Sequence, residues 1–311
     1  MRKNIGGPPV LFSRVRTTLL LLSALACGES STDVVRLSIT IEPQGGLIVG
    51  VGGTLDFLAA VTDESGQLVS GQNVIWSVEN TAIATIDQNG LTTGVSLGTT
   101  TVKASVGEAS RSVRLEVYVR EVISNYEVGK SYFGRNDYVE YIPGELPVVI
   151  SAPHGGALQP GEAADRTYGT TGSDRNTIEL SLALRDALID ATGYAPHVIL
   201  SRLHRSKLDP NREIVEAAQG DPFAENAWHE FQDWIKEARV FVADDYDRGL
   251  YFDMHGHGHS IPRVEIGYLL SGSDLDQNDD ALNNMTMVEK TSIRDLGRHA
   301  PEIFSELLRG P

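Results

Sequence analysis

The sequence contains a single cysteine, Cys27, among its 311 residues. One cysteine cannot form an intramolecular disulfide and cannot supply a cysteine-based zinc site. Basic residues are also scarce, because 26 Lys and Arg stand against 42 Asp and Glu and leave a formal net charge of −16. A protein that binds the phosphate backbone needs a basic face, so this balance argues against nucleic acid as a partner. It suits a solvated protein outside the cell.

The N-terminal part lacks an apolar run long enough to span a bilayer comfortably. Arg14 and Arg16 precede a short apolar run, residues 17–26, which ends directly before Cys27. Basic residues, a short apolar run and then small residues are the parts of a secretory signal peptide. We therefore expect an exported protein with residues 1–26 as its signal peptide.

The same segment resembles a bacterial lipoprotein signal, with Cys27 as the lipidated first residue of the mature chain and residues 27–34 as a polar tether. Ala24 departs from the pattern, which usually has leucine there, and Ala24-Leu-Ala26 also suits ordinary signal peptidase. The resemblance implies that the protein contacts the membrane only through a lipid anchor, on the outer membrane or the cell surface. A periplasmic or secreted protein is the alternative, and an uncleaved N-terminal anchor is the third interpretation.

Residues 35–119 have the pattern of an all-β domain. Short runs of alternating apolar and polar residues recur, separated by turn formers such as Asp63-Glu-Ser-Gly66. Six or seven short strands in this segment predict a two-sheet sandwich, with Trp76 in its core. The runs are Arg36–Ile41, Leu55–Val61, Val74–Val78, Ala84–Ile86, Thr99–Ala104 and Ser112–Val119.

The middle of this segment also carries a motif. It reads Trp76-Ser-Val-Glu-Asn-Thr-Ala-Ile-Ala-Thr-Ile-Asp-Gln-Asn-Gly-Leu-Thr-Thr-Gly94 and continues with Gly98-Thr-Thr-Thr-Val-Lys-Ala. The run resembles the bacterial Ig-like domain of group 2. This resemblance implies a spacer or adhesive module of a surface protein, with a cell-surface glycan or protein as its partner.

Residues 120–145 are interpreted as a linker, and residues 146–311 alternate between strand and helix patterns. Such alternation predicts an α/β domain with a mixed, mostly parallel sheet. The chain is therefore expected to be multidomain, with an all-β Ig-like sandwich followed by this α/β domain. The expected strands are Pro147–Ala152, His197–Ser201, Leu250–Met254 and Val264–Leu270, and the expected helices are residues 176–192, residues 224–242 and a region after Asp279.

Two of the predicted strands end in histidines that are followed by glycines. His154-Gly-Gly follows the first strand of the α/β domain, and His255-Gly-His257-Gly-His259 follows the third, which we expect to be buried. Parallel strands deliver such residues to one edge of the sheet, where α/β enzymes build their sites. His154 and His255 are therefore predicted to form the two halves of one metal site.

Between these histidines, the segment Ser201–Arg212 concentrates basic residues in an acidic protein. Arg202, Arg205 and Arg212 lie within eleven residues. A guanidinium is planar and permanently charged, which suits bidentate capture of a carboxylate. We predict that Arg212, assisted by Asn211, binds a substrate carboxylate. Arg202 and Arg205 are predicted to polarise the scissile carbonyl or to hold a second carboxylate.

Four motifs in order resemble the N-formylglutamate amidohydrolase family, within the wider zinc-carboxypeptidase-like group. The resemblance spans about residues 146–270 and implies a zinc-carboxypeptidase-like fold, a catalytic zinc ion and an amide substrate. It also implies that His154, Asp174 and His255 bind the metal and that the Asn-Arg pair holds the substrate carboxylate. The motifs are Pro153-His154-Gly-Gly156, Ser173-Asp174, Ser201-Arg202 with Asp209-Pro-Asn211-Arg212, and Asp253-Met-His255.

The chain departs from this group close to its first histidine. Zinc carboxypeptidases have a glutamate three residues after that histidine, but here the position is Ala157. The carboxylate ligand must come from further along the chain. Asp174 matches the family's acidic position, with Glu162 and Glu179 as alternatives. An aspartate before a helix also suits plain helix capping.

Three further residues complete the predicted centre. Asp253 lies two residues before His255, on the same face of a strand, where it can orient the histidine ligand. His257 shares that face and is expected to contact substrate. Glu265, on the next predicted strand, is the predicted general base. In the family, however, the corresponding glutamate comes from a strand near the C-terminus. If the chain is a fragment truncated after Pro311, that base and one edge of the sheet are missing, and Glu265 is then only a structural carboxylate.

We therefore expect a zinc-dependent amidohydrolase that cleaves the amide bond of an N-acylated amino acid or of a short peptide with a free carboxylate. Zinc lowers the pKa of its water toward about 7 and polarises the scissile carbonyl. The Ig-like domain is expected to display this enzyme on the cell envelope as a stalk. The alternatives are a non-catalytic surface-binding or adhesion protein with a degenerate pocket, and an envelope carboxypeptidase or peptidoglycan-peptide hydrolase.

Overall fold

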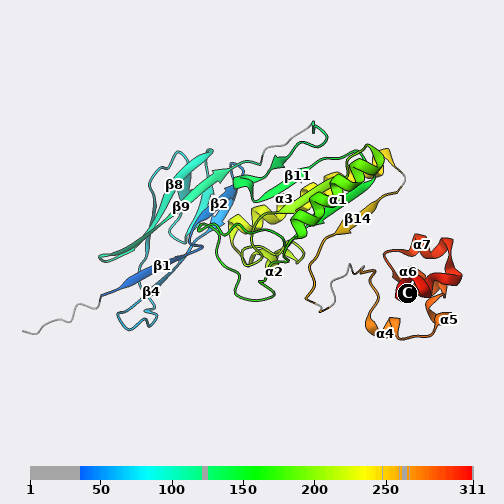
Figure 1. Cartoon of the computed structure of the whole chain (residues 1–311). Helices are drawn as coiled ribbons and strands as arrows, with labels where there is room; N and C mark the ends of the chain where they lie inside the picture. The colour runs from blue at the N-terminus through cyan, green and yellow to red at the C-terminus, as the bar shows by residue number, and fades with distance from the viewer. Residues whose placement is uncertain are drawn as a thin grey trace, which may run out of the picture.

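Three parts follow one another along the chain: a β-sandwich, an α/β domain and a cluster of short C-terminal helices (Figure 1). The predicted signal peptide, Cys27 and His259 lie outside the residues that the structure describes. None of the described helices has the length and apolar character needed to cross a membrane. The computed structural model describes residues 36–120, 125–246, 248–258, 260, 265 and 267–309.

The sandwich forms because alternate residues of its strands face one core. In β8, for example, Val102 and Ala104 are fully buried, and Trp76 of β5 lies in the same core against Phe57. The sequence predicted six or seven strands and did not identify β2 and β7, which are four-residue strands that contain glycine. The strands are β1 (Ser38–Glu42), β2 (Gly46–Val49), β3 (Thr54–Asp56), β4 (Leu58–Thr62), β5 (Ile75–Val78), β6 (Ala84–Ile86), β7 (Leu91–Gly94), β8 (Gly98–Val106) and β9 (Ala109–Tyr118), in sheets ordered β2-β9-β8-β5, β3-β7-β6 and β1-β4.

The α/β domain is built on one five-stranded sheet with the order β10-β11-β13-β12-β14. β12 runs parallel to both β13 and β14, whereas β11 is antiparallel to β13 and to β10. The sheet is therefore mixed, as predicted, but it is not mostly parallel. Its strands are β10 (Tyr132–Phe133), β11 (Val139–Ile142), β12 (Val148–Ala152), β13 (His197–Ser201) and β14 (Leu250–Asp253).

The first two of these strands lie in the segment that the sequence analysis interpreted as a linker. The segment is ordered because its tyrosines pack on the long helix α3 (Pro222–Asp245). The ring of Tyr141 stacks on Trp234, and Tyr126 meets Tyr141 edge to face. Residues 125–145 are thus part of the α/β domain rather than a connection between domains.

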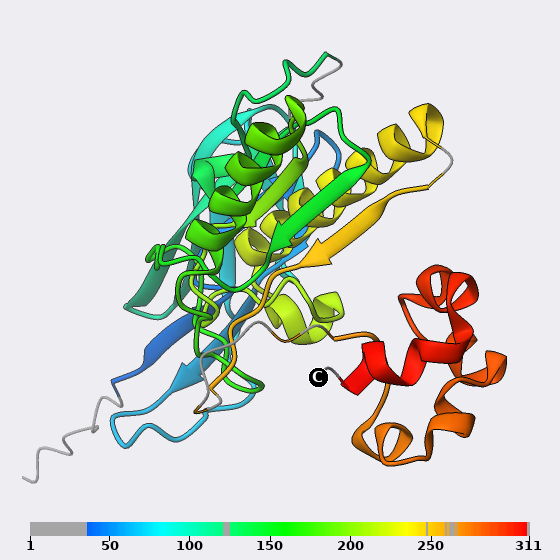
Figure 2. The ribbon, with the colours of Figure 1, turned by 45° about the vertical axis from the view of Figure 1, so that its right-hand side comes forward.

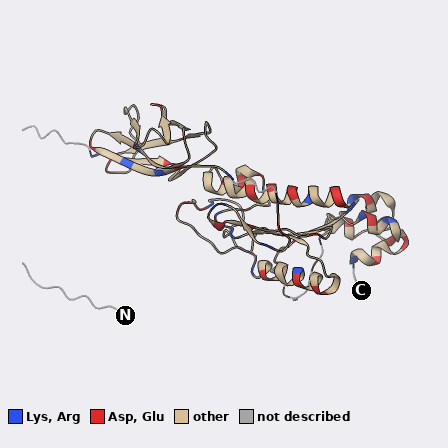
Figure 3. Cartoon of the chain, turned by 90° about the horizontal axis from the view of Figure 1, so that it is seen from above, with Lys and Arg blue, Asp and Glu red and all other residues tan. Residues whose placement is uncertain are grey.

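Two helices cover the opposite faces of the sheet (Figures 2 and 3). Consecutive strand residues alternate between them: Ile150 faces α1 (Thr177–Thr192), while Val149 faces α3. The predicted helices at residues 176–192 and 224–242 are confirmed. Gly193 ends α1 with a φ of 80°, and Asp221 caps the N-terminus of α3 by accepting two backbone N–H bonds.

The C-terminal strand β14 differs from its prediction, because it lies at the edge of the sheet instead of inside it. Its apolar side chains Leu250, Tyr251 and Phe252 are 60%, 46% and 41% exposed. The described part of the predicted strand Val264–Leu270 has no strand structure. The remaining helices pack around Phe304 in a separate cluster: α4 (Gly272–Leu275), α5 (Asp279–Leu282), α6 (Met285–Lys290), α7 (Arg294–His299), η2 (Pro301–Ile303) and α8 (Phe304–Arg309).

An ion cluster joins the sandwich to the α/β domain. Arg135, in the short helix η1 (Arg135–Asp137), is 6% exposed, and its guanidinium lies 2.8 Å from Glu116 of β9 and 2.5 Å from Glu162. These contacts fix the Ig-like domain against the α/β domain. Because Glu162 is committed to this interdomain ion cluster (Glu116, Arg135 and Glu162), it is not an alternative metal ligand. An apolar cluster crosses the same boundary and is formed by Leu47, Tyr118, Ala163 and Phe223.

We expect Arg135→Met to lower the free energy of unfolding by about 3 kcal/mol, because it removes the buried cation between two half-buried carboxylates and leaves them only the exposed Arg114. Arg114→Met is the matched control, since Arg114 pairs with the same Glu116 and Glu162 but its side chain is 56% exposed. That change should cost less than about 1 kcal/mol. Chemical denaturation measures both values, and equal losses would contradict a special role for the buried arginine.

The buried ring of His197 should make the free energy of unfolding depend on pH. The residue is 1% exposed, and burial lowers the pKa of its ring to about 4. Since the pKa of an unfolded histidine is near 6.5, stability is fully present above that pH and is lost as the pH falls through the folded pKa. The loss should reach about 3 kcal/mol. His197→Asn, which cannot titrate, should flatten this dependence in denaturation measured between neutral and acidic pH. An unchanged pH dependence would count against the assignment.

Candidate metal centre

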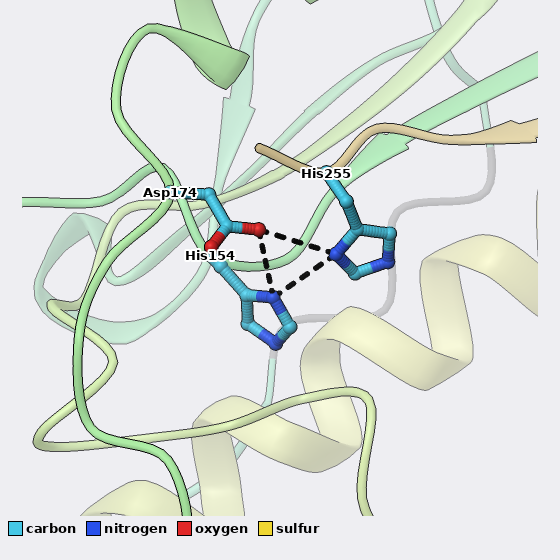
Figure 4. A group of neighbouring side chains, drawn as sticks. All are labelled: His154, Asp174 and His255. Carbon is cyan, nitrogen blue, oxygen red and sulfur yellow. Dashed lines mark hydrogen bonds and ion pairs between the residues drawn. The ribbon is translucent and has the colours of Figure 1, made fainter. Parts of the chain in front are cut away.

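Three side chains from distant segments meet beyond the carboxyl ends of the parallel strands (Figure 4). His154 follows β12, and His255 follows its parallel neighbour β14, so both rings lie at the same end of the two strands. Asp174 arrives from the loop before α1, and its backbone N–H donates to the His154 carbonyl over 2.9 Å. The structure therefore brings together the three residues that the sequence proposed as metal ligands.

The three facing atoms are almost equally spaced. The Nδ1 atoms of His154 and His255 lie 3.2 Å apart, and each is 3.3 Å from Oδ2 of Asp174. The His154 side chain is 2% exposed and that of Asp174 is 13% exposed, whereas that of His255 is 41% exposed. The centre is thus closed on the His154 side and open to solvent beside His255.

Each histidine is held from behind by a carboxylate. Nε2 of His154 lies 2.6 Å from Oδ1 of Asp209, and Nε2 of His255 lies 2.8 Å from Oδ2 of Asp253. An ionised carboxylate can only accept, so both Nε2 atoms carry a proton and donate it. Each ring, when neutral, then presents the Nδ1 lone pair to the centre.

With both rings neutral, three electron-pair donors face one another, an arrangement that a cation stabilises; hydrogen bonds to Asp253 and Asp174 likewise raise the pKa of His255. A tetrahedral zinc ion with N and O ligands at about 2.05 Å sets neighbouring ligand atoms about 3.3 Å apart. The observed separations of 3.2 to 3.3 Å match this spacing. Two histidines and one carboxylate are also a common ligand set of catalytic zinc. The residues present fit a zinc ion.

Asp209 is a functional residue to which the sequence analysis gave no role, although it lies within one of the quoted motifs. It is 0% exposed and also accepts from Nε of Arg205 over 2.9 Å. Burial alone would raise the pKa of Asp209, but the hydrogen bonds from His154 and Arg205 outweigh it and keep the pKa below its usual value. The carboxylate therefore stays ionised and keeps His154 in the required tautomer.

Asp253 lies where the sequence predicted, in position to orient His255. Its Oδ2 also accepts from Nδ2 of Asn211 over 2.5 Å, and its Oδ1 accepts from Ser151. Asn211 and Nε2 of His255 lie 2.9 Å apart because both donate to the same oxygen. Asn211 was predicted to bind substrate. In the structure its amide supports the carboxylate behind His255.

The predicted arginines do not all reach the centre. Nη1 of Arg205 lies 3.6 Å from Oδ1 of Asp174, so Arg205 belongs to it. Arg202 stacks over Phe133 of β10, and β10 is the edge strand opposite to β14. The side chain of Arg212 is 46% exposed and pairs with Glu216 at 3.3 Å. The structure therefore joins one of the three arginines directly to the metal-ligand cluster.

Two other predicted residues follow His255 along the chain. His257 and Glu265 are both exposed. Glu265 does not lie on a strand, so the strand that was expected to carry a general base toward the histidines is not formed by the described residues. Glu179, an alternative ligand, is exposed in the first turn of α1 and is not part of the described metal-ligand group.

Comparison with known proteins identifies the N-terminal domain. The family model of the bacterial Ig-like domain (group 2) matches residues 37–117, which confirms the predicted resemblance for that segment. The match indicates an extracellular or cell-surface protein. It ends before β10, so the resemblance of the α/β domain to the N-formylglutamate amidohydrolases remains a prediction from its motifs.

Individual similar proteins cover only part of the chain. A 3-O-alpha-D-galactosyl-alpha-L-arabinofuranosidase of Bifidobacterium longum subsp. longum is 38% identical over 94 residues, and the match spans 30% of this chain and 8% of that enzyme. Domains 4 and 5 of the S-layer protein SbsC are 22% identical, over 25% of this chain and 50% of that one, with a TM-score of 0.24. An intimin mutant of EHEC O157:H7 is 21% identical, over 32% and 52% of the two chains, with a TM-score of 0.21. TM-scores this low add nothing to the family match.

The geometry predicts the tautomers of both histidines. In protein treated with a chelator at about pH 8, where an ordinary histidine is neutral, nitrogen NMR should show the ring proton of His154 and of His255 on Nε2. Asp253→Asn should weaken this preference for His255 and leave His154 unchanged, because Asp209 still accepts from His154. Protons on Nδ1 in the unaltered protein would contradict the assignment.

Proposed function

We propose that the α/β domain is a zinc-dependent amidohydrolase that acts on an N-acylated amino acid or on a short peptide with a free carboxylate. One observation carries the proposal: two histidine lone pairs and one carboxylate oxygen converge at zinc-ligand spacing, with both Nε2 protons already donated to carboxylates. His154, Asp174 and His255 would hold the ion. When bound, such an ion polarises a scissile carbonyl and activates water for attack.

The chain's own residues would orient the substrate at the open side of the centre, beside His255. Arg212 has an exposed guanidinium whose partner Glu216 follows four residues later. An exposed pair of this kind contributes only about 0–1 kcal/mol, so a substrate carboxylate can replace Glu216 at little cost. Arg205, which is held by Asp209 and faces Asp174, is placed to stabilise negative charge near the ligands.

The proposed reaction also needs a proton-transfer group. The carboxylates described at the centre are Asp174, Asp209 and Asp253, and each already faces a histidine. Glu265 remains the predicted general base, and it lies on the segment that follows His255. In agreement with the predicted signal peptide and the Ig-like domain, we also propose that Cys27 is lipidated and that the enzyme is held on the outer membrane or cell surface.

A second function fits the same observation about the carboxylates. If no further group supplies a base, the centre binds metal without turnover, and the protein is a surface-binding or adhesion protein. An envelope carboxypeptidase or peptidoglycan-peptide hydrolase differs from the main proposal only in substrate. Both alternatives keep the zinc site, so activity measurements distinguish them from the main proposal and a metal assay does not.

The purified protein should contain one zinc ion per chain, and His255→Ala should lose both the metal and the hydrolysis of formyl-amino-acid or C-terminal-peptide substrates. The matched control is His299→Ala, since His299 lies exposed on α7. Elemental analysis and amine release measure the two quantities. No bound zinc in the unaltered protein would overturn the metal site. One zinc ion with no turnover of either substrate would instead select the surface-binding function.

A further inference from the structure

Arg166 is a buried arginine that no motif of the sequence singles out. The residue is 5% exposed and its side chain only 1% exposed. It lies in the loop between β12 and α1. We call residues 155–176 of this loop the ligand loop because they include Asp174. Among the described residues its Nη2 has no hydrogen-bond partner. A buried guanidinium with an unpaired N–H is less stabilising than a well-packed apolar side chain, so packing alone does not account for an arginine at this position.

The other donors of Arg166 connect three segments. Nη1 donates to the Thr170 carbonyl over 2.7 Å and to the Arg205 carbonyl over 3.0 Å, and Nε donates to the Glu216 carbonyl over 3.3 Å. The backbone N–H of Arg166 donates to the Ser206 carbonyl over 2.7 Å. One side chain thus ties the ligand loop to the segment that carries Arg205 and to α2 (Ile214–Ala218).

The loop closes tightly around this guanidinium at Gly169. The φ of Gly169 is +79°, and a Cβ there would come within 2.9 Å of Nη2 of Arg166. The backbone angle therefore favours glycine at this position, and the contact adds to that preference. Glycine thus lets the loop pass close to the guanidinium of Arg166.

The segment that Arg166 holds is the one that supports the metal ligands. The guanidinium of Arg205 contacts two carboxylates, with Nε 2.9 Å from Oδ2 of Asp209 and Nη1 3.6 Å from Oδ1 of Asp174. Its backbone N–H donates to the hydroxyl of Ser173, next to Asp174. Nη1 of Arg166 itself lies 3.9 Å from Oδ2 of Asp209. Arg166 therefore supplies positive charge to the buried carboxylate behind His154 and also fixes the backbone from which Arg205 reaches Asp174.

We propose that Arg166 is a positioning residue of the metal centre, which sets Asp174 and Asp209 in place without touching the metal. The proposal rests on the proposed function for the metal, but its structural part does not. Without the guanidinium, the second half of the ligand loop separates from Arg205, and Asp174 no longer stays opposite the two Nδ1 atoms. The carbonyl of His154 then loses its bond from the Asp174 N–H.

Arg166→Met tests this, with Lys207→Met as the matched control. Lys207 is also a buried cation, 8% exposed, and it anchors the first half of the same loop by donating to the Ala163 carbonyl over 2.8 Å. Its ammonium also pairs with Asp165 at 2.8 Å, in the same half of the loop, so among the described contacts its loss should affect loop stability alone. Arg166→Lys serves as a second variant, because it keeps the charge beside Asp209 if the methionine variant fails to fold.

The first measurement is hydrogen exchange of the Asp174 amide in metal-free protein. Arg166→Met should speed this exchange by at least about tenfold, Arg166→Lys should speed it less, and Lys207→Met should leave it unchanged. The second is zinc affinity by chelator competition, where Arg166→Met should weaken binding by about 10- to 100-fold and Lys207→Met by less than about threefold.

The two measurements separate this proposal from the proposed function. If the unaltered protein binds no zinc, the proposed function fails, while amide exchange still decides whether Arg166 positions Asp174. Unaltered exchange in both Arg166 variants would overturn the positioning role. Equal effects of Arg166→Met and Lys207→Met would overturn it as well, since they would show only that the loop needs a buried cation.

Discussion

The candidate centre depends on the hydrogen bond that each of its histidines donates to a carboxylate behind it. These bonds commit the Nε2 protons, so that the Nδ1 lone pairs of His154 and His255 face each other and Oδ2 of Asp174. Without them, either ring could turn or change tautomer, and three similar distances would carry no chemical meaning. Because Asp209 is fully buried and flanked by guanidinium groups, the constraint is strongest at His154.

The fold supplies this arrangement from segments far apart in the chain. The parallel pairing of β12 with β14 sets the two histidines at one edge of the sheet, and the ligand loop returns Asp174 to the same place. That loop is also connected to the Ig-like domain, since Glu162 near its start belongs to the interdomain ion cluster. The Ig-like domain is therefore in contact with the part of the chain that leads to the centre, which a freely hinged stalk would not be.

Much of this could be predicted from local pattern. Periodicity predicted α1 and α3 to within about three residues at each end, with Gly193 marking the end of α1, and the Ig-like motif predicted the sandwich. The order of the histidine and aspartate motifs named the three residues that converge. Each of these features is written within a short stretch of sequence, where propensity, capping and alternation act.

The remaining features depend on contacts between distant segments. β11 was interpreted as linker because its value as a strand comes from pairing with β13 and packing on α3, neither of which is visible locally. The composition of β14 is typical of a buried strand, yet β14 lies at the edge of the sheet, where its pairing partner among the described strands is β12. Asn211, next to Arg212 in the sequence, was grouped with it for substrate binding, but its amide reaches Asp253. The role of Arg166 could not be predicted, because the sequence does not show whether an arginine is buried.

The central claim is that the Nδ1 atoms of His154 and His255 and Oδ2 of Asp174 are ligands of one metal ion. A crystal structure of the zinc-loaded protein, measured at the zinc absorption edge, tests it most directly. The account predicts one anomalous peak about 2.0–2.2 Å from each of these three atoms. A peak bound through Nε2, or zinc at any other place with this centre empty, would contradict it.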